Sequence, residues 1–345
     1  MIGVSQISVA AYRGGGGAAP VNPDFVSTWD TTQAGSASDT IVLPMTAGNT
    51  VHWGDGTSDT TNTHTYAAGG TYTVTIEGAV NTFRFNNSGD RRKIVDISNW
   101  GGFDFADNNI FRGCSNLDIS ATDIPTISTT TLSSSFNACS SLTTPDFSRW
   151  DTSSVTNMFN TFAGCSLFNS FLNWDTSSVT NMSAMFQNCT SFNQPLNWDV
   201  SSVTNMSTMF QNCTSFNQLL SWDTSSVTSM NAMFYLATSF NQPLNWDTSN
   251  VTDMTSMLRI VSNFDQDISA FDINQVSGFN NFMLGSTLST ANYDALLIAW
   301  DAQGAMSYSG TVNFGGSQYT AGGAAEAAHI SLEAKWGTII DGGSV

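Results

Sequence analysis

Apolar and polar residues repeat with a fixed period through more than half of the chain. Trp-Asp pairs recur every 24 residues, and their tryptophans are Trp150, Trp174, Trp198, Trp222 and Trp246. A period of this length is typical of solenoids, in which each repeat buries its apolar face only against its neighbours. The pattern therefore predicts a stack of similar coils and an extended surface rather than a single catalytic pocket.

Within one repeat, the spacing of the apolar residues changes along the unit. Residues 196–198 alternate apolar and polar, which is the pattern of a short strand. Four apolar residues then follow at steps of three and four, and these predict one buried face of a short helix: Val203, Met206, Phe210 and Cys213. The polar segment 199–202 is typical of a helix N-terminus. Each unit is thus predicted to contain a strand, a cap, a short helix and a turn, with the strands stacked in a parallel ladder.

The period extends beyond the five Trp-Asp pairs and becomes irregular at both ends. Leu258 and Phe282 continue a row of phenylalanines that recurs every 24 residues, and Phe271 with Asp272 replaces a Trp-Asp pair. We count about seven coils between roughly residues 99 and 287. Irregular end copies are expected, because a terminal coil must cap the stack.

All five cysteines occupy one repeat position, where the next two copies carry Ala237 and Val261. These small apolar replacements predict a ladder of buried, reduced cysteines. An odd number of parallel side chains disfavours a disulfide framework. The chain also lacks the CxxC and His-pair spacing of a zinc site. The five residues are Cys114, Cys139, Cys165, Cys189 and Cys213.

The aspartates that follow the tryptophans admit two interpretations. As helix caps, the carboxylates would each be satisfied locally. As a row of clustered oxygen ligands, they would bind calcium, which would relieve a repulsion of roughly 1 kcal/mol between neighbours in water. Known calcium-loop spacings are absent, so capping is favoured, no cofactor is predicted and calcium is the alternative. The row comprises Asp151, Asp175, Asp199, Asp223, Asp247 and Asp272.

The tryptophan row likewise indicates either stacked core aromatics or an exposed sugar-binding surface. Trp198 alternates with polar neighbours and has Leu196 two residues before it, which favours the core. A WD-repeat propeller is disfavoured, because that repeat is about 40–45 residues long and contains a Gly-His element.

Residues 24–85 show short strand patterns at 41–45, 49–53 and 71–76, separated by Gly-containing turns, and predict a small antiparallel β-sandwich. The motifs HWGDGT, THTY and GTYTVTI resemble the PKD type of immunoglobulin-like domain. The resemblance implies that Asp55 shapes a turn. His52 and His64 lie near this motif without an acidic third ligand, so no metal site is assigned.

Four of the nine basic residues lie at the junction that follows, at Arg84 and Arg91–Lys93. Because the formal net charge of the chain is −18, this cluster is predicted to pair with neighbouring carboxylates. Nucleic-acid binding is disfavoured, since the overall field would repel phosphate.

Both ends of the chain carry further patterns. A helix of about 12 residues is expected near 291–304, with Leu296, Leu297 and Trp300 on one face, then a strand at 311–314 and a second helix around 320–335. The first residues alternate in a way that predicts strand addition to a partner, followed by a Gly-rich tether. The residues assigned to this anchor are Ile2, Val4, Ile7, Val9 and Tyr12.

The predicted fold is therefore multidomain: a PKD-like β-sandwich followed by a leucine-rich-repeat-like α/β solenoid with a small α/β cap. The predicted boundaries are an arm at 1–20, the sandwich and junction at 21–98, the solenoid at 99–287 and the capping module at 288–345. No stretch of 18 apolar residues occurs, so membrane insertion is not expected.

The repeat WDTSSVTNM…MF…C…SFNQPLN, the preceding PKD-like motifs and the closing LSTANYDALLIAW together resemble BspA-type leucine-rich-repeat surface proteins. The resemblance covers about residues 24–345 and implies adhesion at a cell surface, with no catalytic residue to carry over. The chain departs from the family in showing no export signal at its start.

That departure leads to the expectation of a bacteriophage virion surface protein (of capsid-decoration, fibre or receptor-binding type) that is assembled in a cytoplasm and docks through residues 1–20. The solenoid would bind a host surface protein or glycan, and the protein could form homo-oligomers on the particle. The alternative is a bacterial adhesin of the BspA type. A polysaccharide-active enzyme is less favoured, because only three histidines occur, at His52, His64 and His329, and no hydrolase motif is present.

Overall fold

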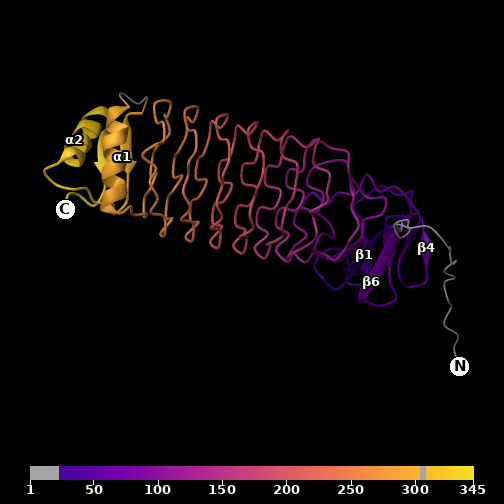
Figure 1. Cartoon of the computed structure of the whole chain (residues 1–345). Helices are drawn as coiled ribbons and strands as arrows, with labels where there is room; N and C mark the ends of the chain where they lie inside the picture. The colour runs from indigo at the N-terminus through magenta and orange to yellow at the C-terminus, as the bar shows by residue number, and fades with distance from the viewer. Residues whose placement is uncertain (1–22, 304–307) are drawn as a thin grey trace, which may run out of the picture.

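The computed structural model describes residues 23–303 and 308–345. Figure 1 shows an elongated molecule with β-sheets at the N-terminal end, a long stack of coils and two helices at the C-terminal end. The described part is rich in β-structure and poor in helix. The predicted arm at residues 1–20, with its anchor residues from Ile2 to Tyr12, lies outside the described residues.

A six-stranded sheet dominates the N-terminal end. Its strand order is β4 (Ser58–Asp59), β3 (Val51–His52), β6 (Thr71–Ile76), β1 (Phe25–Asp30), β7 (Ile94–Asn99) and β9 (Asp118–Ile119). A second sheet pairs β2 (Thr40–Val42) with β5 (Thr63–Thr65). The strand predicted at 71–76 is confirmed, and shorter strands lie in or beside the other two predicted ranges.

Strand β1 was missed by the sequence pattern. Its inward positions are Phe25, Ser27 and Trp29, so a polar residue interrupts the apolar alternation. Ser27 is fully buried and accepts a hydrogen bond from the Trp29 indole nitrogen at 2.9 Å. That bond compensates for the burial of both polar groups.

The antiparallel arrangement predicted for residues 24–85 is confirmed, because every pairing between the strands of this range is antiparallel. Parallel pairing of strands begins only beyond this range. Strand β7 pairs antiparallel with β1 on one side and parallel with β9 on the other. β7 is thus the last long strand of the N-terminal sheet and also the first rung of the coil stack. The following strand in the chain, β8 (Asp104–Phe105), pairs parallel with β10 (Thr126–Ile127) in a separate two-stranded sheet.

Inside the coil stack, the strand predicted at 196–198 and the helix predicted after it were both wrong. Between Ile127 and Thr290 the chain forms turns and isolated bridges. Thr208 and Asn212 have φ angles of 56° and 58°, in the left-handed region, which an α-helix does not tolerate. The parallel bridges lie instead at one later repeat position: Asn157, Asn181, Asn205, Ser229, Asp253 and Gly278.

Backbone hydrogen bonds connect each coil to both of its neighbours. Thr204 N donates to Thr180 O at 2.9 Å, and Met206 N donates to Ser229 O at 3.0 Å. Side chains add a second ladder, in which Asn193 Oδ1 accepts from Asn217 N at 3.0 Å, and the same arrangement recurs in the following coils. Adjacent coils are therefore held by polar groups that satisfy one another.

The apolar residues of the repeat line a continuous core. Val203, Met206, Phe210 and Cys213 are fully buried, although successive tight turns, rather than a helix, bring them inward. The phenylalanine rings stack from coil to coil, with a centroid distance of 5.8 Å between Phe186 and Phe210.

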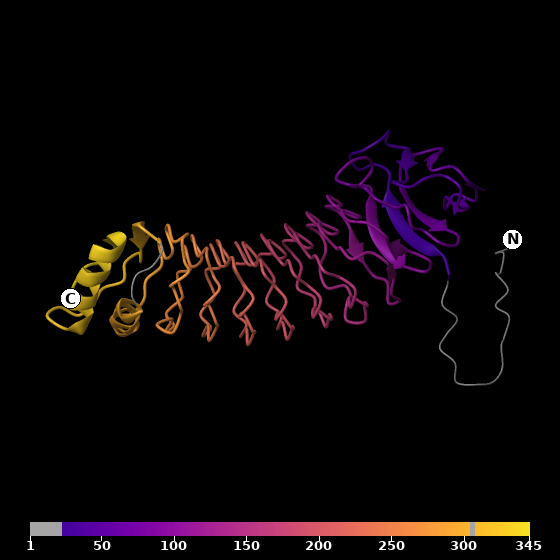
Figure 2. The ribbon, with the colours of Figure 1, turned by 90° about the horizontal axis from the view of Figure 1, so that it is seen from above.

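The C-terminal elements follow the expected order. Helix α1 (Thr290–Ala302), helix α2 (Ala324–Trp336) and the strand expected at 311–314, which is β11 (Gly310–Asn313), are confirmed. β11 pairs parallel with β12 (Gly337–Ile340), a strand that the sequence did not indicate. Figure 2 shows both helices beyond the last coil. Met283 N donates to Asn313 O at 2.8 Å, so this module continues the stack.

Candidate functional site

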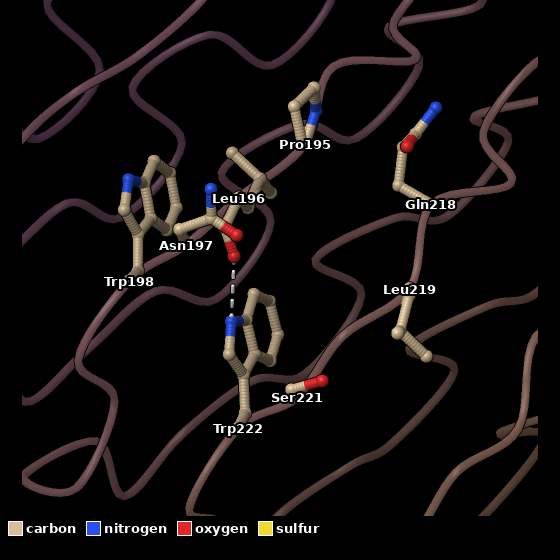
Figure 3. Close-up of a pocket in the computed structure, with 8 residues that line it drawn as sticks. All are labelled: Pro195, Leu196, Asn197, Trp198, Gln218, Leu219, Ser221 and Trp222. Carbon is tan, nitrogen blue, oxygen red and sulfur yellow. Dashed lines mark hydrogen bonds between the residues drawn. The ribbon is translucent and has the colours of Figure 1, made fainter.

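The tryptophan side chains lie in the core of the stack. The Trp222 indole nitrogen donates to Leu196 O of the preceding coil at 3.1 Å (Figure 3). Trp174, Trp198 and Trp246 make the same bond one coil apart. Because Trp198 is only 6 % exposed, its ring face is not open to a sugar.

Burial alternates strictly along the segment that precedes and follows each of these tryptophans. Leu196 and Trp198 are buried, whereas Pro195, Asn197 and Asp199 are exposed. Alternate residues of an extended chain point to opposite sides, so the three exposed positions share the outer side of the coil.

Stacking four coils turns these positions into three parallel rows, which we call the three-row face. The apolar row contains Phe171, Pro195, Leu219 and Pro243; the polar row contains Asn173, Asn197, Ser221 and Asn245; and the carboxylate row contains Asp175, Asp199, Asp223 and Asp247. Phe171 and Leu219 are 47 % and 54 % exposed. The face thus presents exposed apolar side chains beside amides and charges.

A pocket of about 380 Å³ opens on this face between two consecutive coils. Its lining residues, drawn in Figure 3, are Pro195, Leu196, Asn197 and Trp198 of one coil and Gln218, Leu219, Ser221 and Trp222 of the next. Proline is shorter than leucine or phenylalanine, so the alternation of Pro195 with Leu219 along the apolar row makes the surface uneven.

The predicted role of the aspartates as helix caps was wrong, because no helix follows them. Asp199 Oδ1 accepts both the backbone N–H and the hydroxyl of Ser201, at 3.0 Å and 2.7 Å, which closes a local turn. Asp151 and Asp175 make the same pair of bonds. The hydrogen bond from the Ser201 hydroxyl, and to a smaller extent the one from the Ser201 backbone N–H, lowers the pKa of Asp199 below its usual value.

The second carboxylate oxygen of Asp175, Asp199, Asp223 and Asp247 makes no hydrogen bond within the described residues. Between residues 150 and 258 the sequence contains no Lys, Arg or His. The carboxylate row is therefore not neutralised by basic residues of its own coils. Among the described residues, no group of three or more His, Cys, Asp or Glu side chains could hold a metal ion.

A family model for a Mycoplasma protein of unknown function, DUF285, matches residues 130–221 and again residues 218–313. Together the two matches cover more than half of the chain. The chain belongs to this family. No curated protein and no solved structure matches the chain significantly. Within the described residues, no helix is long and apolar enough to cross a membrane.

The structure places all five cysteines in the core, free and fully buried. Cys189 Sγ donates to Phe162 O at 3.0 Å, and Cys213 Sγ donates to Phe186 O at 2.9 Å. Burial raises the pKa of the Cys189 and Cys213 thiols. A thiol with a raised pKa is a poor nucleophile and a poor metal ligand.

The histidines of the N-terminal sheets belong to two separate pairs. His52 lies 2.7 Å from Glu77, and His64 lies 2.9 Å from Asp55. Asp55 accepts hydrogen bonds mainly from the Thr57 hydroxyl, which lowers the pKa of Asp55 to about 2. This local bonding fits the turn-shaping role expected for Asp55.

The basic cluster pairs with carboxylates only in part. Arg84 forms an ion pair with Asp107 at 2.5 Å. Lys93 is fully buried and donates instead to two backbone carbonyl oxygens at 2.7 Å each, Ala37 O in the loop before β2 and Thr40 O at the start of β2. The prediction of carboxylate pairing was wrong for Lys93, because the nearby Asp90 carboxylate is occupied by Ser36 and Val42.

The capping module contains a further polar cluster that the sequence pattern did not indicate. Asp341 Oδ2 accepts a hydrogen bond from Tyr293 at 2.7 Å and lies 3.0 Å from His329 Nε2. The His329 ring stacks on Tyr319 at a centroid distance of 4.5 Å. These residues are distant in sequence, so no motif could have indicated the cluster.

Proposed function

We propose that the protein is a non-enzymatic, surface-displayed interaction protein whose three-row face binds its partner. The observation that carries this proposal is the exposure of Phe171 and Leu219, at 47 % and 54 %, on alternate coils of one row, with the exposed Pro195 between them. Exposed apolar surface rimmed by polar residues is typical of interaction sites. A leucine-rich-repeat-like solenoid offers such a surface over its whole length.

The chemistry of the repeated residues supports a binding role over catalysis. Oδ1 of Asp199 is engaged in a turn, and the Cys213 thiol is buried with a raised pKa. Neither the carboxylates nor the thiols are arranged as an acid–base pair or as an activated nucleophile. No catalytic residue is therefore proposed.

The other parts of the chain fit a displayed protein. The N-terminal sheets would act as a PKD-like spacer, and residues 1–20 would attach the protein to a larger particle. The predicted location is a bacteriophage virion, with a host surface protein or glycan as the partner. Deleting residues 1–13 is then expected to leave a folded protein that no longer joins particles, whereas normal incorporation would contradict an anchoring arm.

A BspA-type adhesin on a bacterial envelope is the second candidate, and the family match favours it because the description of that family names Mycoplasma proteins. Immunogold labelling with an antibody against residues 99–287 separates the two, on phage lysate and on intact bacteria. Label on particles supports the virion role, and label on envelopes alone supports the adhesin. Label on neither would overturn surface display.

A further inference from the structure

The three-row face combines features that define the chemistry of a partner. Four carboxylates with an unbonded oxygen lie in one row, in a segment of 109 residues (150–258) that contains no basic residue. Charge complementarity therefore requires a cationic partner. It also disfavours a second copy of this chain, because two molecules with a formal net charge of −18 repel each other.

The order of the three rows also restricts the chemistry of the partner. The polar row, with three asparagines and Ser221, lies between the carboxylate row and the apolar row. Asparagine side chains both donate and accept hydrogen bonds, as a peptide backbone does. A chain laid along the polar row would direct alternate side chains to opposite sides, so that one set meets the carboxylates and the other set meets Pro195 and Leu219.

The spacing of the coils also suits an extended peptide. Ring centroids one coil apart are separated by 5.8 Å for Phe186 and Phe210 and by 6.2 Å for Trp222 and Trp246. Alternate residues of an extended strand are about 6.6 Å apart. The mismatch is small enough for four alternate side chains of a peptide to reach four successive coils.

We infer that the three-row face binds an extended polypeptide segment in which basic and apolar residues alternate, running along the stack over the coils from Phe171 to Asp247. This inference rests on the proposed function and gives its partner a chemical class. An oligosaccharide is disfavoured, because Trp198 and Trp222 are only 6 % and 5 % exposed and cannot stack on sugar rings.

The test measures binding of fluorescent peptides to the full chain by anisotropy. The probe is an eight-residue peptide of alternating Lys and Val, and its control has the same composition with four Lys followed by four Val. The alternating peptide is expected to bind more tightly by about fivefold or more, and added salt is expected to weaken both peptides. Equal binding of the two peptides would overturn the proposed register, and no binding of either would overturn the inference.

The matched variants are Asp199→Asn with Asp223→Asn, and Asp59→Asn. Asparagine keeps the side-chain oxygen that closes each turn, so the fold is expected to persist in all of them. Asp59 closes the same kind of turn with Thr61 but lies in β4, far from the face. The double variant should weaken binding about fivefold or more, and Asp59→Asn should leave it unchanged.

Leu219→Ser tests the apolar row, since this side chain is 54 % exposed and its loss should leave the core intact. Weaker binding of the alternating peptide, with unchanged binding of the block peptide, is the expected result. Binding of a glycan that is lost in Leu219→Ser but kept in the Asp double variant would overturn the inference in favour of sugar. Surface labelling is independent of these outcomes, so the proposed function can stand while the peptide inference fails.

Discussion

Replacing Trp198 with alanine tests how the coils hold one another. The indole is 6 % exposed, packs against Phe186 at a centroid distance of 6.0 Å and donates to Leu172 O at 3.1 Å. Truncation of a core aromatic costs about 3–5 kcal/mol. The carbonyl of Leu172 also loses its donor, which places the expected loss toward the upper end of that range.

Trp198→Phe separates most of the packing from the hydrogen bond, because a six-membered aromatic ring remains while the five-membered ring and its N–H donor are lost. It should cost about 1–2 kcal/mol. Trp150→Phe is the matched control, since the buried Trp150 indole nitrogen has no hydrogen-bond partner among the described residues. That control variant should be less destabilised than Trp198→Phe by about 1 kcal/mol.

The assay is urea unfolding monitored by circular dichroism. The free energy of unfolding and its dependence on urea concentration are compared between variants. A broader transition for Trp198→Ala would indicate that the coils on its two sides unfold separately, as stacks coupled only through neighbours do. A loss below about 1 kcal/mol would refute the buried role of the tryptophan row.

Three further predictions concern other groups. Hydrogen bonds lower the pKa of Asp199, and they lower the pKa of Asp55 to about 2. The unfolded chain therefore binds more protons than the folded chain as the pH falls from about 4, so the urea midpoint of unfolding should decrease between pH 4 and pH 2. A constant midpoint would contradict this. The cysteines should resist iodoacetamide at pH 8 in the folded protein and react fully in denaturant, as read by mass spectrometry; rapid native labelling would show that the core is open. Lys93→Met should destabilise the protein by about 3 kcal/mol in urea unfolding, because Ala37 O and Thr40 O lose their donor; a loss below 1 kcal/mol would show that water replaces it.

The sequence indicated inside and outside positions in the repeat but not the backbone that produces them. Val203, Met206 and Phe210 were expected on one buried face, and they are fully buried. Steps of three and four residues are typical of a helix, yet turns with left-handed residues such as Thr208 give the same burial. Periodicity reports which residues face the core and not the dihedral angles between them.

The candidate site was likewise predictable from the sequence only in part. The row of aspartates was visible in the sequence, and so was the lack of basic residues around it. The exposure of Leu219 was not visible, because a leucine in a repeat is expected to be buried. Its exposure follows from its neighbours Leu220 and Trp222, which take the inward positions of an alternating segment.

The sequence by itself determined the 24-residue period, the acidic charge and the residues that recur at each position. Each copy of the repeat carries the same pattern of residues, so these properties can be inferred from the sequence without knowing any contact between distant segments. Only the tertiary structure decided that β7 joins the sheets to the stack, that Lys93 is buried against carbonyls and that Asp341 meets Tyr293 and His329. Each of these depends on a contact between segments far apart in the chain, where neither spacing nor propensity carries information.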